Sequence, residues 1–100
     1  MLYSERQIVT RIKGHIKRRG GAYKTWVVGI DKEPRSRLFT SHRVRKVGDF
    51  WILMHAKSCA AARKVQSYLI KKVGLRSGLK LEDPSADFVY AYMRSGHTTP

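Results

Sequence analysis

The sequence is poor in cysteine, and it has no long apolar run. Cys59 is the only cysteine among 100 residues, which excludes an internal disulfide and a zinc site built on several thiolates. No stretch approaches the roughly 18 consecutive apolar residues of a membrane-spanning helix, and no signal peptide is visible. We therefore expect a soluble protein of the cytoplasm, with Cys59 packed as a small apolar residue at the start of a helix.

Acidic residues are also scarce: 7 Asp and Glu face 21 Lys and Arg, a formal net charge of +14. Such an excess repels itself in a folded chain, and it indicates a polyanionic partner. Nucleic acid, either DNA or RNA, is the first expectation. A membrane surface is a weaker one, because the basic first helix has a narrow apolar stripe without the Trp, Phe or Leu of a membrane anchor. A highly soluble, solvated surface is the remaining interpretation.

Apolar periodicity predicts six elements in the order α-β-α-β-α-β. The predicted helices are 1–20, a short one from Pro34 to about His42, and 59–73; the predicted strands are 23–30, 49–56 and 87–93. The residues after the last helix, 75–85, are predicted to be irregular. This pattern indicates a small two-layer α/β sandwich with a three-stranded sheet and three helices. We expect one domain over residues 1–94 and a flexible tail over 95–100.

The local signals behind these predictions are simple. Ser4 and Gln7 form a capping-box pattern, and Ile8, Ile12 and Ile16 lie on one face of the helix that follows. The strand around Trp26, Val27 and Val28 is apolar enough to be buried on both faces. In the last strand Phe88, Tyr90 and Tyr92 should share one face, and Val89, Ala91 and Met93 the other.

Short motifs follow one another in order between Tyr23 and about Lys72. Gly21-Ala22-Tyr23 leads into the predicted strand 23–30, Val27-Val28-Gly29 lies within it, and Arg37 and His42 belong to the helix after it. In this order and spacing the chain resembles the GIY-YIG nuclease superfamily. The site of that family combines two tyrosines, an arginine on the following helix, sometimes a histidine or tyrosine one turn later, and a metal-binding glutamate.

The resemblance implies that Tyr23, Arg37, His42 and Gln66 are the catalytic positions. Arg37 would stabilise phosphate charge, Tyr23 or a C-terminal tyrosine would help to activate water, and His42 would shuttle a proton. Gln66 stands where the family has its glutamate, and a neutral amide is a poor ligand for Mg²⁺. We therefore expect phosphodiester cleavage to be weak or lost, with no certain cofactor and with Mg²⁺ only if the chain is active.

The chain departs from the family in its first strand. Val27 replaces the second tyrosine, and the few residues between Tyr23 and Val27 leave no room for a hairpin. We predict that the strand 87–93 takes the sheet position of the missing strand, where Tyr90 or Tyr92 would supply the lost phenol. Glu82 or Asp83 is the candidate substitute for the metal ligand.

Basic residues are concentrated between Arg11 and Lys46, where 12 residues are Lys or Arg and only Asp31 and Glu33 are acidic. The end of the first helix, the short helix and the loop 43–48 are predicted to form one positive surface that binds phosphates without reading sequence. The candidate contacts to nucleic acid are Arg18, Arg19, Lys24, Arg35, Arg43, Arg45 and Lys46. His55 and most aromatic residues are expected in the core.

Two further functions remain open. One is a nucleic-acid-binding module that uses the same basic face without catalysis. The other is a protein-interaction or assembly domain that binds an acidic partner.

Overall fold

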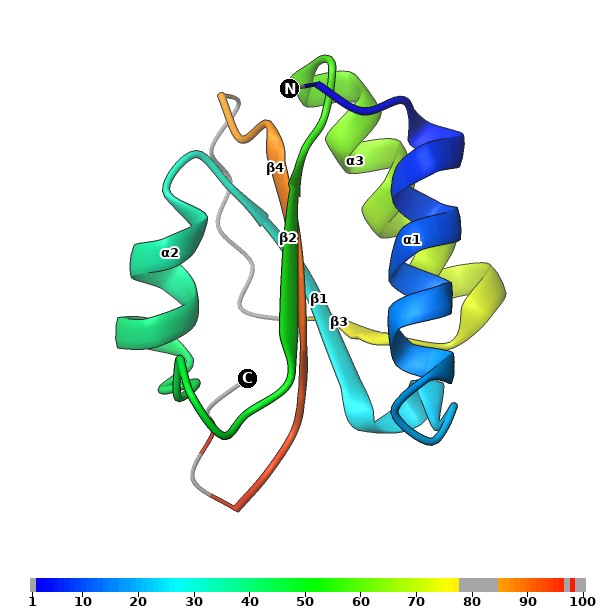
Figure 1. Cartoon of the computed structure of the whole chain (residues 1–100). Coiled ribbons are helices and arrows are strands. Elements are labelled where there is room, and N and C mark those ends of the chain that lie inside the picture. The colour runs from blue at the N-terminus through cyan, green and yellow to red at the C-terminus, as the bar shows by residue number, and fades with distance from the viewer. Residues whose placement is uncertain (1, 78–84, 97, 99–100) are drawn as a thin grey trace.

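A four-stranded mixed sheet forms the centre of the protein (Figure 1). The computed structural model describes residues 2–77, 85–96 and 98. The strands are β1 (Trp26–Asp31), β2 (Trp51–His55), β3 (Arg76–Ser77) and β4 (Phe88–Met93), in the order β2-β4-β1-β3. β4 runs antiparallel to both β1 and β2, whereas β3 is parallel to β1.

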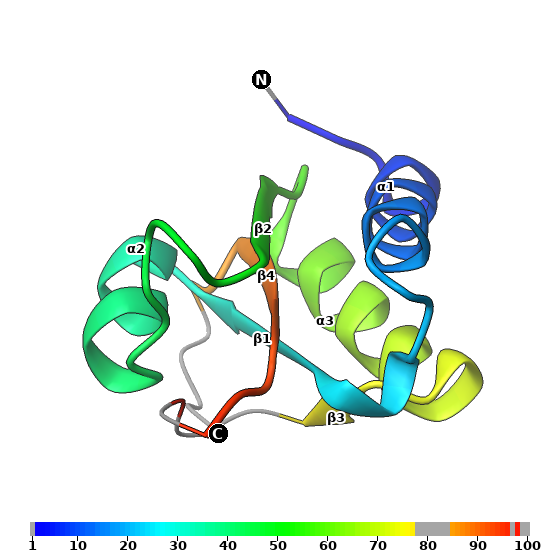
Figure 2. The ribbon, with the colours of Figure 1, turned by 60° about the horizontal axis from the view of Figure 1, so that its bottom comes forward.

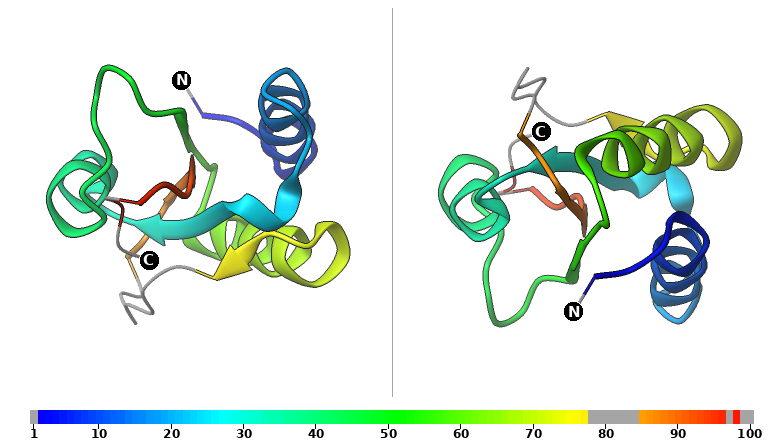
Figure 3. Two further views of the ribbon diagram at one scale, coloured as in Figure 1. Left: turned by 90° about the horizontal axis from the view of Figure 1, so that it is seen from below. Right: turned by 90° about the horizontal axis from the view of Figure 1, so that it is seen from above.

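Helices cover both faces of this sheet. One face carries α1 (Glu5–Lys17) and α3 (Cys59–Tyr68), which continues as a π-helix, η3 (Leu69–Val73). The other face carries α2 (Pro34–Ser36), which continues as a π-helix, η2 (Arg37–Ser41). Figures 1 and 3 both show this helix on the side of the sheet opposite to α1 and α3. A short 3₁₀ turn, η1 (Tyr23–Thr25), leads into β1.

Both long helices begin at their predicted caps and the helix after Ser58 ends at the predicted Gly74, whereas α1 ends at Lys17, three residues before its predicted end at Gly20. Ser4 caps α1 through a complete capping box with Gln7, and Ser58 caps α3 by accepting a hydrogen bond from the amide of Ala61. Gly74 ends η3 with a φ of 103°, a left-handed conformation that a glycine adopts without strain.

The core lies in two clusters, one on each face of the sheet. The cluster under α1 and α3 includes the Ile stripe of α1 with Trp26, Val28, Val89 and Ala91. The cluster under α2 consists of Val27, Leu38, Val44, Tyr90 and Tyr92. β1 is therefore buried on both faces, as predicted, and the predicted facing of Val89, Tyr90, Ala91 and Tyr92 in β4 is confirmed.

The structure corrects two parts of the predicted fold. The sheet has four strands rather than three, because Arg76–Ser77 pairs with Val27 and Val28 at the edge of the sheet. The sandwich has three layers rather than two, because Leu38 packs α2 against the face of the sheet opposite to α1 and α3. A small mixed α/β fold with three helices is confirmed.

β4 lies beside β1. The sequence predicted this position for it, as a replacement for the first strand that the chain lacks in comparison with GIY-YIG domains. β4 pairs with β1 along its whole length, with Gly29 opposite Tyr90 and Ile30 opposite Val89. Val28 and Val89 belong to the same buried cluster. The predicted neighbourhood of these two strands is thus confirmed.

Some predictions fall outside the described residues. These are Glu82 and Asp83 as metal ligands, and residues 97, 99 and 100 of the predicted tail. Among the residues that are described, no helix has both the length and the apolar character needed to cross a bilayer.

Candidate functional site

The candidate site lies between α2 and the middle of the sheet, and it starts with the pair Gly29 and Tyr90. The two residues face each other across β1 and β4. A Cβ added to Gly29 would overlap Cζ and Oη of Tyr90 and would lie 2.9 Å from its Cε2. Glycine at this position therefore lets the phenol ring of Tyr90 lie against the backbone of β1.

His42 lies between the hydroxyl groups of two tyrosines of β4. Its Nε2 is 2.7 Å from Oη of Tyr90, its Nδ1 is 3.0 Å from Oη of Tyr92, and only 1% of the residue is exposed. In a neutral imidazole one nitrogen donates and the other accepts. One phenol therefore donates to the ring while the other accepts from it, which makes a continuous buried chain of three polar groups.

The two phenols stay protonated at neutral pH. Burial, with smaller contributions from Tyr92 and Asp31, raises the pKa of Tyr90 far above its ordinary value, against the opposing effect of Arg37. Burial likewise raises the pKa of Tyr92 to about 12, although Arg94 acts in the opposite direction. Both hydroxyl groups are therefore suited to donating a hydrogen bond, and neither is suited to act as a base at neutral pH.

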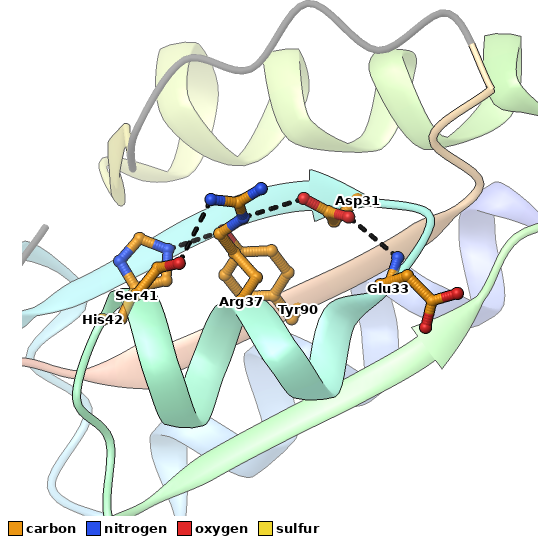
Figure 4. A network of polar contacts seen from close by, with 6 residues as sticks. All are labelled: Asp31, Glu33, Arg37, Ser41, His42 and Tyr90. Atoms are coloured by element: carbon orange, nitrogen blue, oxygen red, sulfur yellow. Dashed lines mark hydrogen bonds and ion pairs between the residues drawn. The ribbon is translucent and has the colours of Figure 1, made fainter.

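Arg37 is held in place beside Tyr90 by two contacts, which Figure 4 shows together with His42. Its Nε donates to Oδ2 of Asp31 at 2.9 Å, and its Nη1 donates to Oγ of Ser41 at 3.1 Å. Asp31 also accepts from the amide of Glu33 at 2.8 Å through Oδ1. Because a guanidinium has five N–H donors, Arg37 keeps donors for a further partner, and a quarter of its side chain is exposed.

The local sequence explains why Arg37 and His42 come together. Pro34 occupies the first turn of α2, where its missing N–H costs no hydrogen bond. The helix then widens, and the amide of His42 donates to the carbonyl of Arg37 at 2.9 Å. This i→i−5 bond is typical of the π-turns that often occur at functional sites, and it joins the two predicted residues through one backbone bond.

The other two predicted catalytic residues lie elsewhere. Tyr23 packs against the cluster on the opposite face of the sheet, and Gln66 belongs to α3, which covers that same face. The structure therefore brings together Arg37 and His42 but not Tyr23 and Gln66. The phenols beside His42 come from Tyr90 and Tyr92, the residues that were predicted to replace the lost tyrosine.

The described residues around Arg37 do not fit a Mg²⁺ ion. Mg²⁺ prefers carboxylate ligands, and Asp31, the carboxylate that contacts Arg37, is already bonded by Arg37 and by the amide of Glu33. In the described ranges no three residues among His, Cys, Asp and Glu are grouped so that they could hold a metal. The arrangement fits the binding of an anion by Arg37 instead.

Cations from separate parts of the chain meet at the end of the sheet where β1 begins. Nε of Arg76 donates to the carbonyl of Lys24 at 3.2 Å, and the amide of Arg94 donates to the carbonyl of Thr25 at 2.7 Å. The loop before β2 reaches the same end (Figures 1 and 2). We call this end of the molecule the basic edge and define it by the exposed cations of the segments that begin or end there: Arg18, Arg19, Lys24, Arg43, Arg45, Lys46, Arg76 and Arg94.

The acidic residues are distributed in the opposite way. Of those described, only Asp49 lies at the basic edge, and its Oδ2 accepts from the amide of Arg45 at 2.7 Å. Asp31 and Glu33 follow the far end of β1, and Asp87 pairs with His55 at the far end of β2 at 2.7 Å. The molecule therefore has a strongly positive end and a more balanced one.

One predicted nucleic-acid contact is not part of the basic edge. Arg35 lies in the first turn of α2, close to where β1 ends at Asp31. The single surface predicted to run from the first helix over the short helix to the loop 43–48 is thus interrupted at Arg35. The other six predicted contacts belong to the basic edge.

A groove of about 390 Å³ lies on the other face of the sheet, between α1 and α3. Val9, Val65 and Tyr68 line it together with the charged residues Glu5, Arg6 and Lys64. It is separate from Arg37, which lies on the α2 face.

Comparisons of the chain with protein-family models, with curated proteins and with solved structures found no match.

Proposed function

We propose that this chain is a nucleic-acid-binding domain whose basic edge holds the phosphate backbone of DNA or RNA. The observation that carries the proposal is the convergence of exposed cations from separate segments on one end of the sheet, where the one described carboxylate is bonded to the backbone. A surface of this kind binds phosphates with little dependence on base sequence.

Arg37 supplies a second phosphate contact in this proposal. Its guanidinium is fixed by Asp31 and Ser41, and its remaining N–H groups are directed by those bonds rather than free to rotate. A fixed fork of donors suits a phosphate group. In this proposal Arg37 and His42 keep the positions that the resemblance to GIY-YIG domains implies, and the phenols come from Tyr90 and Tyr92 of β4.

We propose further that phosphodiester cleavage is weak or lost. Cleavage of the family's kind needs a cation to stabilise the leaving oxygen, and Gln66 lies on the opposite face of the sheet from Arg37. The phenols next to His42 remain protonated, so they do not supply a base at neutral pH.

The binding proposal is tested with two charge-matched triple variants. Arg18→Ala/Arg19→Ala/Lys24→Ala removes three cations from the basic edge, whereas Lys32→Ala/Arg35→Ala/Lys57→Ala removes three exposed cations from the other end. Affinity for labelled nucleic acid is measured over a range of salt concentrations. Each phosphate contact adds about 0.9 to the log–log salt slope on duplex DNA, so the first variant should lose up to about 3 from the slope and the second should lose little.

Two outcomes contradict the binding proposal. An absence of binding by the unaltered chain at low salt removes it, and the acidic-protein partner then becomes the leading alternative. An equal loss of salt slope in both variants shows that binding depends on the net charge of the protein and not on the position of the cations at the basic edge.

The cleavage proposal is tested by a nicking assay on supercoiled plasmid with Mg²⁺ or Mn²⁺. We expect the unaltered chain and Arg37→Ala to give the same background of nicked product. Nicking that requires Arg37 would show that catalysis has been retained.

A further inference from the structure

Phe50 is an exposed aromatic side chain at the basic edge, in contact with Arg19. It is 41% exposed, and Val47, three residues before it, is 88% exposed, whereas Leu2 and Tyr68 are the only other large apolar residues exposed in the described part of the chain. Exposed apolar rings among cations have a cost in water and are characteristic of binding surfaces. Phe50 and Val47 therefore leave apolar surface among the cations of the basic edge, which makes this surface a candidate for binding.

The ring of Phe50 is held in place by its neighbours. The backbone carbonyl of Phe50 accepts from the amide of Met93 at 3.0 Å, which fixes the backbone of Phe50 to the end of β4. Cζ of Arg19 lies 4.8 Å from the centroid of the ring, in a cation–π contact. Phe50 thus presents a fixed apolar ring that has the guanidinium of Arg19 over one face.

We propose that Phe50 stacks an unpaired base, so that the basic edge prefers single-stranded nucleic acid to duplex. This inference rests on the proposed function of the basic edge. Sequence-independent single-strand binding combines a positive surface along the backbone with aromatic rings on which bases stack. In a duplex the base faces are covered by their neighbours, so an exposed ring at the protein surface has no base face to contact.

The positions of the cations agree with this arrangement. Arg19 lies over the ring itself, and Arg94 follows Met93, whose amide is bonded to Phe50. Trp51, the residue after Phe50, donates through its Nε1 to the carbonyl of Lys46 at 3.1 Å. A base placed on Phe50 would have cations from three segments around its flanking phosphates.

The test compares Phe50→Ala with Tyr68→Ala. Tyr68 is also an exposed aromatic residue, at 45%, but it lines the groove between α1 and α3, away from the basic edge. The probes are a labelled DNA single strand of about 20 nucleotides and the duplex of the same sequence, long enough for several phosphate contacts. Binding is measured by fluorescence anisotropy at low salt.

Phe50→Ala should weaken binding to the single strand about tenfold, the loss expected for one stacked base, and should change duplex affinity by less than about twofold. Tyr68→Ala should change neither affinity. Phe50→Trp should preserve single-strand binding because it keeps a stacking face, whereas Phe50→Leu should behave like Phe50→Ala because it keeps only apolar bulk. Unchanged urea midpoints identify variants that remain folded.

The outcomes separate this inference from the function on which it rests. Equal losses on single strand and duplex, or no loss in Phe50→Ala, overturn the stacking role while the Arg18/Arg19/Lys24 variant still reports on the basic edge. If the unaltered chain binds neither probe, the proposed function fails and the inference fails with it.

Discussion

At the scale of single residues, Gly29 decides whether Tyr90 can reach His42. The ring of Tyr90 occupies the space where any other residue would place its Cβ. A single methyl group added at Gly29 would therefore disturb the contact between Gly29 and Tyr90. This contact links the strand motif Val27-Val28-Gly29 to the buried Tyr90 and His42.

Gly29→Ala should destabilise the fold by about 1–3 kcal/mol, the usual cost of overpacking. The control is Gly14→Ala in α1, where an added Cβ meets only Nη1 of Arg18 at 3.7 Å. That variant should gain about 0.5–1 kcal/mol, because alanine is the better helix former. Urea unfolding measures both changes in the free energy of unfolding.

The double variant Gly29→Ala/Tyr90→Ala isolates the contact. With the ring removed, Gly29→Ala should cost much less than it does in the unaltered chain, which gives a coupling energy between the two positions. Additive effects would show that Gly29→Ala acts on the backbone of β1 and not on Tyr90.

His15 should make stability depend on pH. Burial, followed by the charges of Arg19 and Arg18, lowers its pKa from the ordinary 6.5. Its Nε2 is buried and, within the described part of the chain, has no hydrogen-bond partner, while its ring contacts Trp26 edge-on at 5.5 Å between centroids. The folded state therefore disfavours the protonated form.

The sign follows from this lowered pKa. As the pH falls below 6.5, the unfolded chain takes up a proton on His15 before the folded chain does. The contribution of neutral His15 to the free energy of unfolding is therefore present above that pH and is lost as the pH falls through its folded-state pKa. The free energy of unfolding of the unaltered chain should decrease more between pH 8 and pH 5 than that of His15→Gln. Urea titrations at both pH values measure this difference, and equal decreases would contradict the role of His15.

The sequence predicted part of the site at this scale. The resemblance to GIY-YIG domains selected Arg37 and His42, and the prediction that the strand 87–93 replaces a missing strand selected Tyr90 or Tyr92; the structure places both phenols beside His42. The sequence could not give the partner of Arg37, because Asp31 in the turn before the helix has many possible roles. It also misplaced Tyr23 and Gln66 relative to Arg37, because local patterns do not define which face of a sheet a helix covers.

At the scale of elements, the first helix depends on its cap. The Oγ of Ser4 accepts from the amide of Gln7 at 3.2 Å, and Oε1 of Gln7 accepts from the amide of Ser4 at 2.8 Å. These bonds satisfy amides that the first turn of a helix leaves unpaired. They also set the start of the helix that buries Ile8, Ile12 and Ile16.

Ser4→Ala should therefore lower the free energy of unfolding by about 1 kcal/mol. Ser36→Ala is the matched control, because Ser36 is exposed and makes no capping bond. Thermal or urea unfolding distinguishes the two, and similar small effects would show that α1 does not need the cap.

Most elements were predictable from the sequence because each has its own periodic apolar pattern. The edge strand β3 was not, because it has only the two residues Arg76 and Ser77, both exposed and polar. Its pairing with Val27 and Val28 joins segments about half the chain apart. The third layer was missed for a related reason, since the short helix buries few side chains and its apolar pattern does not show which face of the sheet it covers.

At the scale of the whole molecule, charge opposes folding. The formal net charge is +14, and eight of the exposed cations share the basic edge. Repulsion among exposed charges is screened over about 10 Å at 0.1 M salt. Stability should consequently rise as sodium chloride is added at low ionic strength.

We expect a gain on the order of 1 kcal/mol between very low salt and about 0.3 M salt. The Arg18/Arg19/Lys24 variant should show a smaller gain than the Lys32/Arg35/Lys57 variant, because it removes cations that lie close to one another. Urea midpoints over a salt series measure both gains, and identical salt responses would argue against crowding of charge at the basic edge.

The place of β4 in the sheet has a consequence for how the protein is made. Among the strands that the structure describes, β1 and β2 are joined to each other only through β4, which follows both of them in the chain. While a ribosome is still adding residues up to Ser77, β1 and β2 have been synthesised but have no strand between them. The sheet is therefore completed only after β4 has been synthesised, and until then the nascent chain exposes the two apolar strands that β4 will separate.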